Sequence, residues 1–311
     1  MTDLIRYRSM ISDSARWNGF PLRPGDIIIS TPPKSGTTWM QMLCALLVFD
    51  DPDFGRPLSD ISPWLDMLTL PLPIVVATLE AQQHRRFIKT HTPFDGLPLD
   101  ERVTYLCIGR DPRDVGLSWD NHRANLDMES VMAARAAAVG LDDIADQGPP
   151  QPPPADVRDR FWAWAATEAS PLANGTSLQS ALHHLHTGWV RRQEPNVALF
   201  HYSDLCADLV GELGRLAVAL GTRVAAERLA ELSRAASFEQ MRARSAELAP
   251  RGAKSHWHSS ERFFDQGPAR RWPDVLTPTD AARYERRVAA LSDDHEFLAW
   301  VHGGWRAVSD R

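Results

Sequence analysis

The sequence predicts an α/β fold in which helices cover both faces of a central parallel sheet, giving three layers. Short β-branched and apolar runs alternate along the chain with longer segments of helical periodicity, as is typical of strands joined by crossover helices. The short runs are apolar throughout, which indicates strands buried on both faces. With 311 residues, of which 43% are hydrophobic and 24% charged, the chain can bury a sizeable core.

The predicted strands are Asp26–Ser30, Arg86–Thr90, Val103–Ile108 and Asn196–Tyr202. The predicted helices are Thr37–Phe49, Asp111–Arg123, Leu178–Arg192, Leu205–Leu220, Ala225–Ala236 and Pro278–Leu291. Residues 140–154 depart from this rhythm, because their prolines favour extended or irregular backbone. No internal repeat and no shift in composition demands a second domain, so we expect one domain over residues 1–311.

The charge balance constrains the partners of the protein. Lysine and arginine number 34 against 40 aspartates and glutamates, which gives a net charge of −6 and a pI near 6.0. That balance argues against general affinity for DNA or RNA, which needs clustered positive charge. It still allows a local basic pocket that binds a small anion.

Several features favour a soluble, cytoplasmic protein. The first residues lack the apolar region of a secretory signal. The longest apolar run, Met42–Phe49, is far shorter than the roughly 20 residues that span a bilayer. The three cysteines, Cys44, Cys107 and Cys206, are odd in number and lie in apolar surroundings, which predicts buried reduced thiols.

The sharpest local signal is the junction between the first predicted strand and the helix that follows it. A loop containing Lys34 and Gly36 opens a helix rich in hydroxyl groups. Free N–H groups and the positive dipole end of a helix attract anions, and a lysine adds a full charge. The lysine precedes the glycine, so this is not a Walker A loop. An ordinary turn capped by Ser35 or Thr37 remains an alternative explanation.

Three ordered motifs resemble those of the cytosolic-type sulfotransferases, which use 3′-phosphoadenosine 5′-phosphosulfate (PAPS). Pro33–Trp39 (PKSGTTW) is similar to the family's 5′-phosphosulfate loop, and Lys89–Pro93 (KTHTP) to its catalytic segment. Thr104–Ser118 resembles the strand, loop and helix that hold the 3′-phosphate. Outside the motifs, the sequence is most similar in appearance to mycobacterial-type glycolipid sulfotransferases. The resemblance implies a P-loop NTPase-like three-layer fold.

The resemblance also implies roles for individual residues. Lys34 would meet the charge on the leaving nucleotide (the product PAP), Lys89 would steady the moving sulfuryl group, and His91 would be the general base. Ser118 would bind the 3′-phosphate and could also restrain Lys34. The implied cofactor-binding residues are Lys34, Ser35, Gly36, Thr37, Thr38, Trp39, Arg110, Ser118, Tyr202, Phe238, Gly267, Arg270 and Arg271. No metal is required, since lysines supply the charge, and His183, His184, His186, His256 and His258 form no recognisable ligand set.

One segment departs from the family pattern. Asp265 and Gln266 stand where the family carries two basic residues that bind the 3′-phosphate, although Gly267 and Trp272 fall into register. Either Asp265 points outward, or Arg270 and Arg271 supply the missing charge. The dimerisation motif of the vertebrate enzymes is also missing at Pro273–Ala282, so that dimer is not predicted and the oligomeric state stays open.

The acceptor is expected to be an amphipathic hydroxyl compound, a glycolipid or an apolar natural product. Ser62–Pro73 offers an apolar wall, with simple packing of a crossover as the alternative. Residues 121–177 are interpreted as a lid or insertion at the acceptor site. Peripheral contact with a membrane remains open. The competing functions are a P-loop-related kinase or NTPase and a catalytically degraded nucleotide-binding protein.

Overall fold

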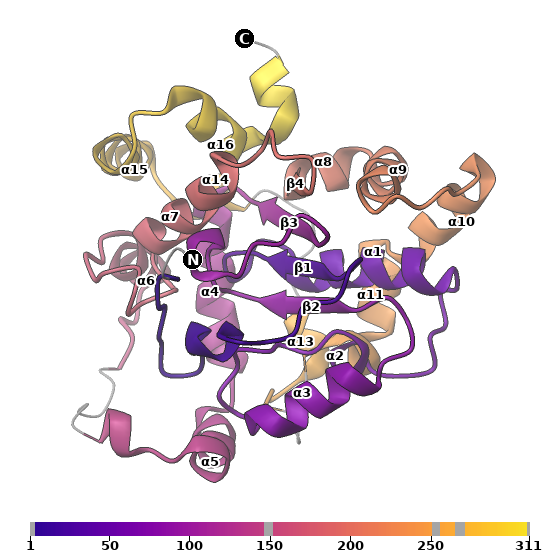
Figure 1. The fold of residues 1–311 in the computed structure, drawn as a ribbon. Coiled ribbons are helices and arrows are strands. Elements are labelled where there is room, and N and C mark those ends of the chain that lie inside the picture. The colour runs from indigo at the N-terminus through magenta and orange to yellow at the C-terminus, as the bar shows by residue number, and fades with distance from the viewer. Residues whose placement is uncertain (1–3, 146–151, 251–255, 265–270, 310–311) are drawn as a thin grey trace.

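A computed structural model describes residues 4–145, 152–250, 256–264 and 271–309 (Figure 1). Its centre is a 4-stranded sheet of β1 (Ile27–Ser30), β2 (Phe87–Thr90), β3 (Thr104–Gly109) and β4 (Val197–His201). All pairings are parallel and the order is β2-β1-β3-β4. The strand predictions are confirmed, because continuous apolar runs identify strands covered on both faces.

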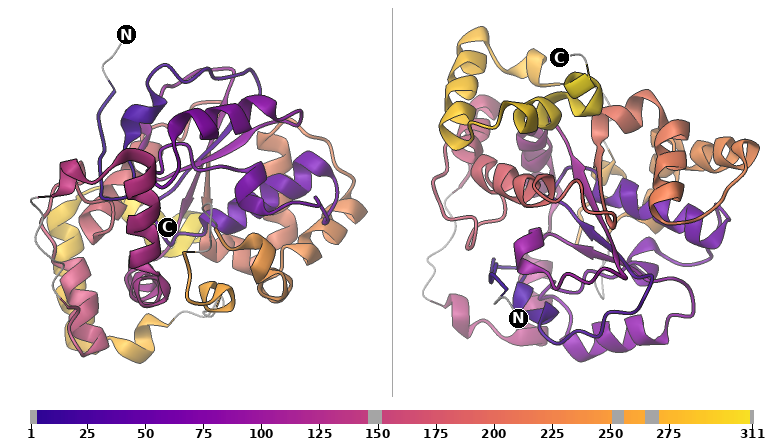
Figure 2. Two further views of the ribbon diagram at one scale, coloured as in Figure 1. Left: turned by 90° about the horizontal axis from the view of Figure 1, so that it is seen from below. Right: turned by 45° about the horizontal axis from the view of Figure 1, so that its top comes forward.

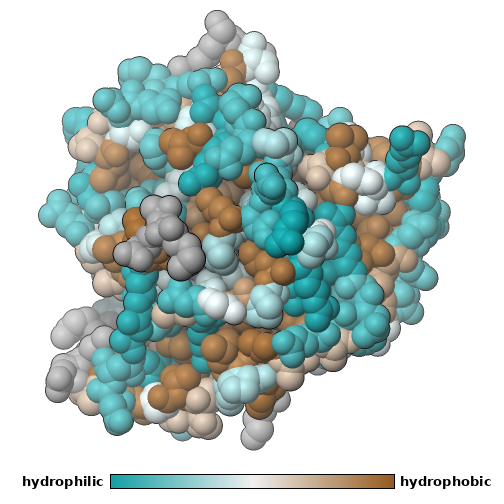
Figure 3. Space-filling view, in the orientation of Figure 1, coloured by the Kyte–Doolittle hydropathy of each residue, from teal (hydrophilic) through white to brown (hydrophobic). Residues whose placement is uncertain are grey.

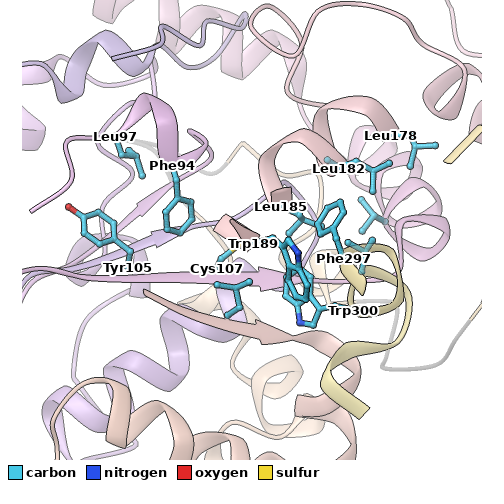
Figure 4. Packing of buried hydrophobic residues seen from close by; sticks show 14 of the residues in the cluster. Phe94, Leu97, Tyr105, Cys107, Leu178, Leu182, Leu185, Trp189, Phe297 and Trp300 are labelled. Atoms are coloured by element: carbon cyan, nitrogen blue, oxygen red, sulfur yellow. The ribbon is translucent and has the colours of Figure 1, made fainter. Parts of the chain in front are cut away.

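Each face of the sheet carries its own core, which confirms the three-layer prediction (Figures 1 and 2). Ile27 and Ile29 of β1 pack with α1 (Thr37–Phe49), α9 (Leu209–Ala219) and α10 (Ala226–Ala235). On the other face, Cys107 of β3 faces α7 (Leu178–Trp189) and α16 (His295–Ser309), where Trp189 and Trp300 stack at 5.5 Å (Figure 4).

The sheet register fixes where the chemistry can lie. Ile29 of β1 pairs with Lys89 of β2, and Ser30 pairs with Thr90. The loop that follows β1 and the segment that follows β2 therefore leave the sheet side by side at its carboxyl edge, the usual binding edge of such sheets.

Most predicted helices are confirmed, and the differences have local causes. The predicted helix Leu205–Leu220 is divided into α8 (Tyr202–Ala207) and α9, because Asp208 has extended backbone (φ −151°) and caps α9. The predicted apolar loop before β2 leads into a helix that was not predicted, α3 (Leu72–Ala81). Pro71 is the N-cap of this helix, and a further proline lies in its first turn, where proline is tolerated.

α4 (Pro112–Asn125) confirms the predicted helix Asp111–Arg123 and leads into α5 (Met128–Val139). Neither α5 nor α6 (Val157–Ala165), which follows the Pro-rich stretch, was predicted. The remaining elements are α2 (Leu58–Ile61), α11 (Phe238–Ala243), α12 (Ser245–Leu248), α13 (Ser260–Phe263), α14 (Trp272–Val275), α15 (Pro278–Leu291) and the 3-10 helices Ser14–Trp17, Phe94–Gly96 and Asp142–Ile144.

The surface in Figure 3 mixes polar residues with scattered apolar ones. In the part of the chain that the structure describes, no helix is both long and apolar enough to cross a membrane. Cys44 and Cys107 are buried as predicted, but the prediction is wrong for Cys206, which is exposed in the short helix α8 and lines the cavity described below.

Candidate active site

The loop between β1 and α1 is bent tightly around Gly36. Gly36 has φ 111°, and a Cβ there would lie 3.0 Å from Cδ1 of Ile108 and 3.1 Å from the Tyr202 ring. No side chain caps α1, so the cap explanation of Ser35 and Thr37 is wrong. Ser35 is buried and its hydroxyl has no hydrogen-bond partner among the described residues. Free helix N–H groups beside an unsatisfied hydroxyl favour an anion site.

Lys34 lies in the same loop and also has a positive φ, 68°. Its carbonyl oxygen accepts a hydrogen bond of 3.1 Å from Arg110. Its ammonium lies 3.5 Å from Nδ1 of His122 and 4.7 Å from the centre of the Phe263 ring. Burial, and then repulsion by Arg110 and Lys89, lowers the pKa of Lys34 to about 7.

Lys89 lies one residue before the end of β2 and is buried, with its Nζ 4.5 Å from the centre of the Trp64 ring. Burial lowers the pKa of Lys89 to about 8, and the charge of Asp66 opposes that shift. The Asp66 carboxylate is buried and accepts hydrogen bonds from the hydroxyls of Thr90 (2.8 Å) and Thr92 (2.5 Å). The negative charge of Asp66 therefore favours the protonated form of Lys89.

His91 presents a free nitrogen lone pair. Its Nδ1 lies 2.7 Å from the carbonyl oxygen of Thr31. A carbonyl only accepts hydrogen bonds, so Nδ1 carries the proton and Nε2 is left as a base. Burial and the nearby Lys89 charge hold the pKa of His91 well below its ordinary value, so the ring is neutral. Trp64 fixes the ring by an edge contact at 4.7 Å.

These groups line a single cavity of about 440 Å³. One half is made by residues of the sheet edge and of α11, and there the Trp39 ring lies 5.2 Å from Tyr202. Arg110 lies 4.4 Å above that tyrosine ring. Ile11, Met67, Leu126, Val131 and Leu172 also line the cavity and make the remaining half more apolar, whereas Trp257, Phe263 and Phe264 belong to the same apolar cluster as Trp39 and Phe238.

The "Sulfotransferase domain" family model matches residues 24–295 of the chain. The chain belongs to the sulfotransferase family. It is 46% identical over 318 residues to the glycolipid sulfotransferase of Mycobacterium bovis (strain BCG / Pasteur 1173P2), covering 98% of this chain and 96% of that protein. It is 45% identical over 317 residues to the glycolipid sulfotransferase of Mycobacterium tuberculosis (strain ATCC 25177 / H37Ra), with the same coverage of 98% and 96%.

Solved structures agree on the fold. Retinol dehydratase in complex with androsterone and inactive cofactor PAP has a TM-score of 0.66 at 22% identity, covering 90% of this chain and 84% of that one. Mouse sulfotransferase SULT7A1 complexed with PAP has a TM-score of 0.65 at 18% identity, covering 91% and 88%. The P-loop NTPase-like fold class is thereby confirmed, and sulfuryl transfer is favoured over the kinase-like alternative.

The sulfotransferase cavity brings most of the predicted site residues together. Lining it are Lys34, Gly36, Thr37, Thr38, Trp39, Lys89, His91, Arg110, Ser118, Tyr202 and Phe238. Ser35 is buried under the loop. Arg271 is exposed, donates its backbone N–H to Asp114 (3.0 Å) and does not line the cavity. Asp265, Gln266, Gly267 and Arg270 lie outside the described residues.

The structure also places residues that the sequence analysis missed or assigned differently. Lys34 contacts His122 rather than Ser118, and no hydrogen bond of Ser118 is present in the described part of the chain. His122 follows Ser118 by one helical turn, a spacing that could have drawn attention to it. Tyr7, from the first segment of the chain, forms a hydrogen bond of 2.7 Å with His183 and lines the cavity.

The predicted apolar wall is present in part. Trp64 and Met67 line the cavity, whereas Leu65 and Leu68 are buried in the body of the protein. Within the described ranges, no group of three or more His, Cys, Asp or Glu side chains could hold a metal ion.

The Asp66 charge yields a prediction about pH. Asp66→Asn removes the charge that raises the pKa of Lys89, so that pKa falls further below its ordinary value. A lysine is charged only below its pKa, and Lys89 will therefore lose its proton at a lower pH. We expect faster acetylation of Lys89 at pH 7.5, measured by mass spectrometry. Asp60→Asn, at an exposed site on α2, is the control. Unchanged labelling in Asp66→Asn would contradict the argument.

Proposed function

We propose that this sulfotransferase moves the sulfuryl group of PAPS to a hydroxyl of a glycolipid, releasing PAP. The observation that carries the proposal is the free Nε2 of His91, which faces the cavity beside two lysines. The names of the mycobacterial relatives support a glycolipid acceptor. The PAP bound in retinol dehydratase and in mouse sulfotransferase SULT7A1, which share this fold, supports this nucleotide. The free thiols Cys44 and Cys107 support a cytoplasmic location.

His91 is the proposed general base. Nε2 takes the proton of the acceptor hydroxyl as its oxygen bonds to sulfur, and the bond between sulfur and the bridging oxygen of the nucleotide breaks. The hydrogen bond to Thr31 keeps the other ring proton on Nδ1 throughout. Because the ring is neutral before the reaction, it needs no prior loss of a proton.

The lysines stabilise charge. Sulfuryl transfer, like phosphoryl transfer, depends on alignment and on charge stabilisation in a loose transition state. Lys34 lies in the loop that precedes α1, with its ammonium lining the cavity, and is assigned to the leaving oxygen. Lys89 lies next to His91 and is assigned to the oxygens of the moving group. Their buried charges are costly in the empty site and become favourable once an anion is bound.

The nucleotide half of the cavity suits an adenosine with two anionic groups. Trp39, Tyr202 and Phe238 offer ring faces, and base stacking on such rings is worth about 1–3 kcal/mol per base. Arg110 is assigned to the 3′-phosphate with Ser118, because a guanidinium binds phosphate through paired hydrogen bonds. The loop from Lys34 to Thr38 is assigned to the phosphosulfate.

The acceptor half is built largely by segments outside the sheet edge. Leu126 and Val131, near α5, and Leu172 line it, which supports the assignment of residues 121–177 as an acceptor-site insertion in a single domain. Arg135 of α5 is fully buried and donates to the Met10 carbonyl (2.7 Å) and to the Asp143 carboxylate (2.6 Å). Asp143 also pairs with Arg8 at 2.5 Å. This Arg135–Asp143–Arg8 link joins the first segment of the chain to α5 across the acceptor half.

Substitution of the two reacting groups tests the proposed chemistry. We expect Lys34→Ala and His91→Ala each to lower kcat by at least about a hundredfold, the usual cost of losing a general base or a charge stabiliser. His91→Ala should bind PAP nearly as tightly as the native protein, measured by calorimetry. Transfer of labelled sulfur from PAPS to a glycolipid panel gives the rates, and full activity of either variant would remove that residue from the mechanism.

The missing basic residues near the 3′-phosphate generate a second test. If Arg270 or Arg271 supplies that charge, replacing both with alanine will weaken PAP more than 5′-AMP, which lacks the 3′-phosphate. A charge-assisted hydrogen bond predicts a loss of about ten- to a hundredfold. Arg271 is exposed and Arg270 lies outside the described residues, so each single variant should be titrated separately. Equal losses for both ligands would exclude this compensation.

A substitution in the Arg135–Asp143–Arg8 link should change acceptor binding without changing nucleotide binding. Asp143→Ala removes the shared partner of Arg8 and Arg135, so we expect the acceptor KM to rise severalfold while PAP affinity changes less than about twofold. Asp142→Ala is the matched control, since Asp142 is exposed in the same turn. If the acceptor KM stays the same in Asp143→Ala, the link has no role in acceptor binding.

A further inference from the structure

His122 of α4 lines the cavity beside Lys34. Its ring stacks on Trp119 at 5.0 Å with an interplanar angle of 22°, and it meets the edge of Trp257 at 4.9 Å. Phe263 closes the third side at 6.4 Å. These contacts fix the orientation of the ring and therefore the direction of its Nδ1.

That nitrogen faces the Lys34 ammonium at 3.5 Å. An ammonium has three donors and no acceptor, so Nδ1 must supply a lone pair. The ring is therefore neutral, with its proton on Nε2. Burial, followed by the charges of Lys34 and Lys89, holds the pKa of His122 well below its ordinary value, in agreement with this assignment.

The backbone of Lys34 is fixed separately. The left-handed φ and the hydrogen bond from Arg110 to the carbonyl set where the side chain starts. The side chain then ends against His122 and over the Phe263 ring, a face that attracts a cation without accepting a directional hydrogen bond. His122 thus provides the hydrogen-bond acceptor for this ammonium among the described residues.

We propose that His122 is a positioning residue that holds the Lys34 ammonium in the empty site and releases it when the anionic sulfuryl donor binds. The inference rests on the function proposed above, in which Lys34 moves to the leaving oxygen. A phosphosulfate oxygen carries more negative charge than a neutral imidazole, so the lysine will exchange one partner for the other. The role belongs to His122 and not to Ser118, although both lie on one face of α4.

The walls around His122 are attached to the same helix. Asn125 donates its side-chain amide to the carbonyl of Ser259 (2.8 Å) and accepts from the Ser259 N–H (3.0 Å). The His258 N–H donates to the Asn125 carbonyl (2.9 Å). The segment that carries Trp257 and Phe263 therefore moves with α4, so that the resting place of Lys34 is rigid.

The reactivity of Lys34 in the empty protein tests the inference. Trace acetylation at pH 7, quantified by mass spectrometry, reports how well the ammonium is held. His122→Phe keeps the stacking but has no acceptor, and we expect Lys34 labelling to rise about three- to tenfold, as for loss of a weak hydrogen bond with a charged donor. His122→Asn places an amide oxygen near the Nδ1 position and should stay near the native rate. Ser118→Ala is the matched control and should not raise the rate.

Kinetics give a second readout. His122→Phe should lower the KM for PAPS severalfold at a pH at which Lys34 is charged, because a contact made only in the empty site opposes donor binding. It should change kcat less than about twofold, because bound donor holds Lys34 in either protein. If His122→Phe fails to fold, His122→Gln is used instead. The glutamine amide lies at the position of Nε2, where it does not reach Lys34, so labelling should rise as in His122→Phe. Native labelling rates in these variants, or an equal rise in His122→Asn or Ser118→Ala, would overturn the inference.

The outcome is separable from the proposed function. Addition of PAP to the native protein should protect Lys34 from acetylation. If PAP gives no protection, the nucleotide assignment is wrong, while labelling of the empty variants still decides whether His122 holds the lysine.

Discussion

The hydrogen bond from Nδ1 of His91 to the carbonyl oxygen of Thr31, 2.7 Å long, joins the ends of β2 and β1. It is available because the register places Ser30 opposite Thr90, so that the next residue of each strand lies within reach. The same bond decides which ring nitrogen is basic. One local arrangement therefore sets the sheet pairing, the shape of the loop and the protonation of His91.

A concentration of positive charge follows from that arrangement. Lys34, Lys89 and Arg110 converge on one cavity in a protein whose net charge is −6. Burial and mutual repulsion lower the pKa of both lysines, and His91 and His122 remain neutral beside them. A dianionic or trianionic ligand relieves these costs together, which explains how the pocket selects an anion although the whole protein is acidic.

The sequence predicted the strands well because a strand buried on both faces has a distinctive continuous apolar run. The resemblance to sulfotransferase motifs also implied that Lys34, Lys89 and His91 share one site, and the structure places them at the edge where the parallel strands β1 and β2 end. It missed α3, where proline occupies the first helical turn and resembles a loop signal. It missed His122 because the neighbours of that ring, Trp257 and Phe263, are far away in sequence and no periodicity connects them.

The buried Arg135 has a consequence for exchanging parts between relatives. Arg135 donates hydrogen bonds to the carbonyl oxygens of Met10 and Gly140, and it therefore links the first segment of the chain to the turn after α5. The residues of the nucleotide half lie at the carboxyl edge of the sheet and take no part in these hydrogen bonds of Arg135. A chimera that adopts another acceptor would have to transplant both segments as a cassette, since either one alone would leave a guanidinium enclosed without its carbonyl partners. Under the proposed assignment, the residues that hold the donor and those that hold the acceptor belong to separate parts of the chain.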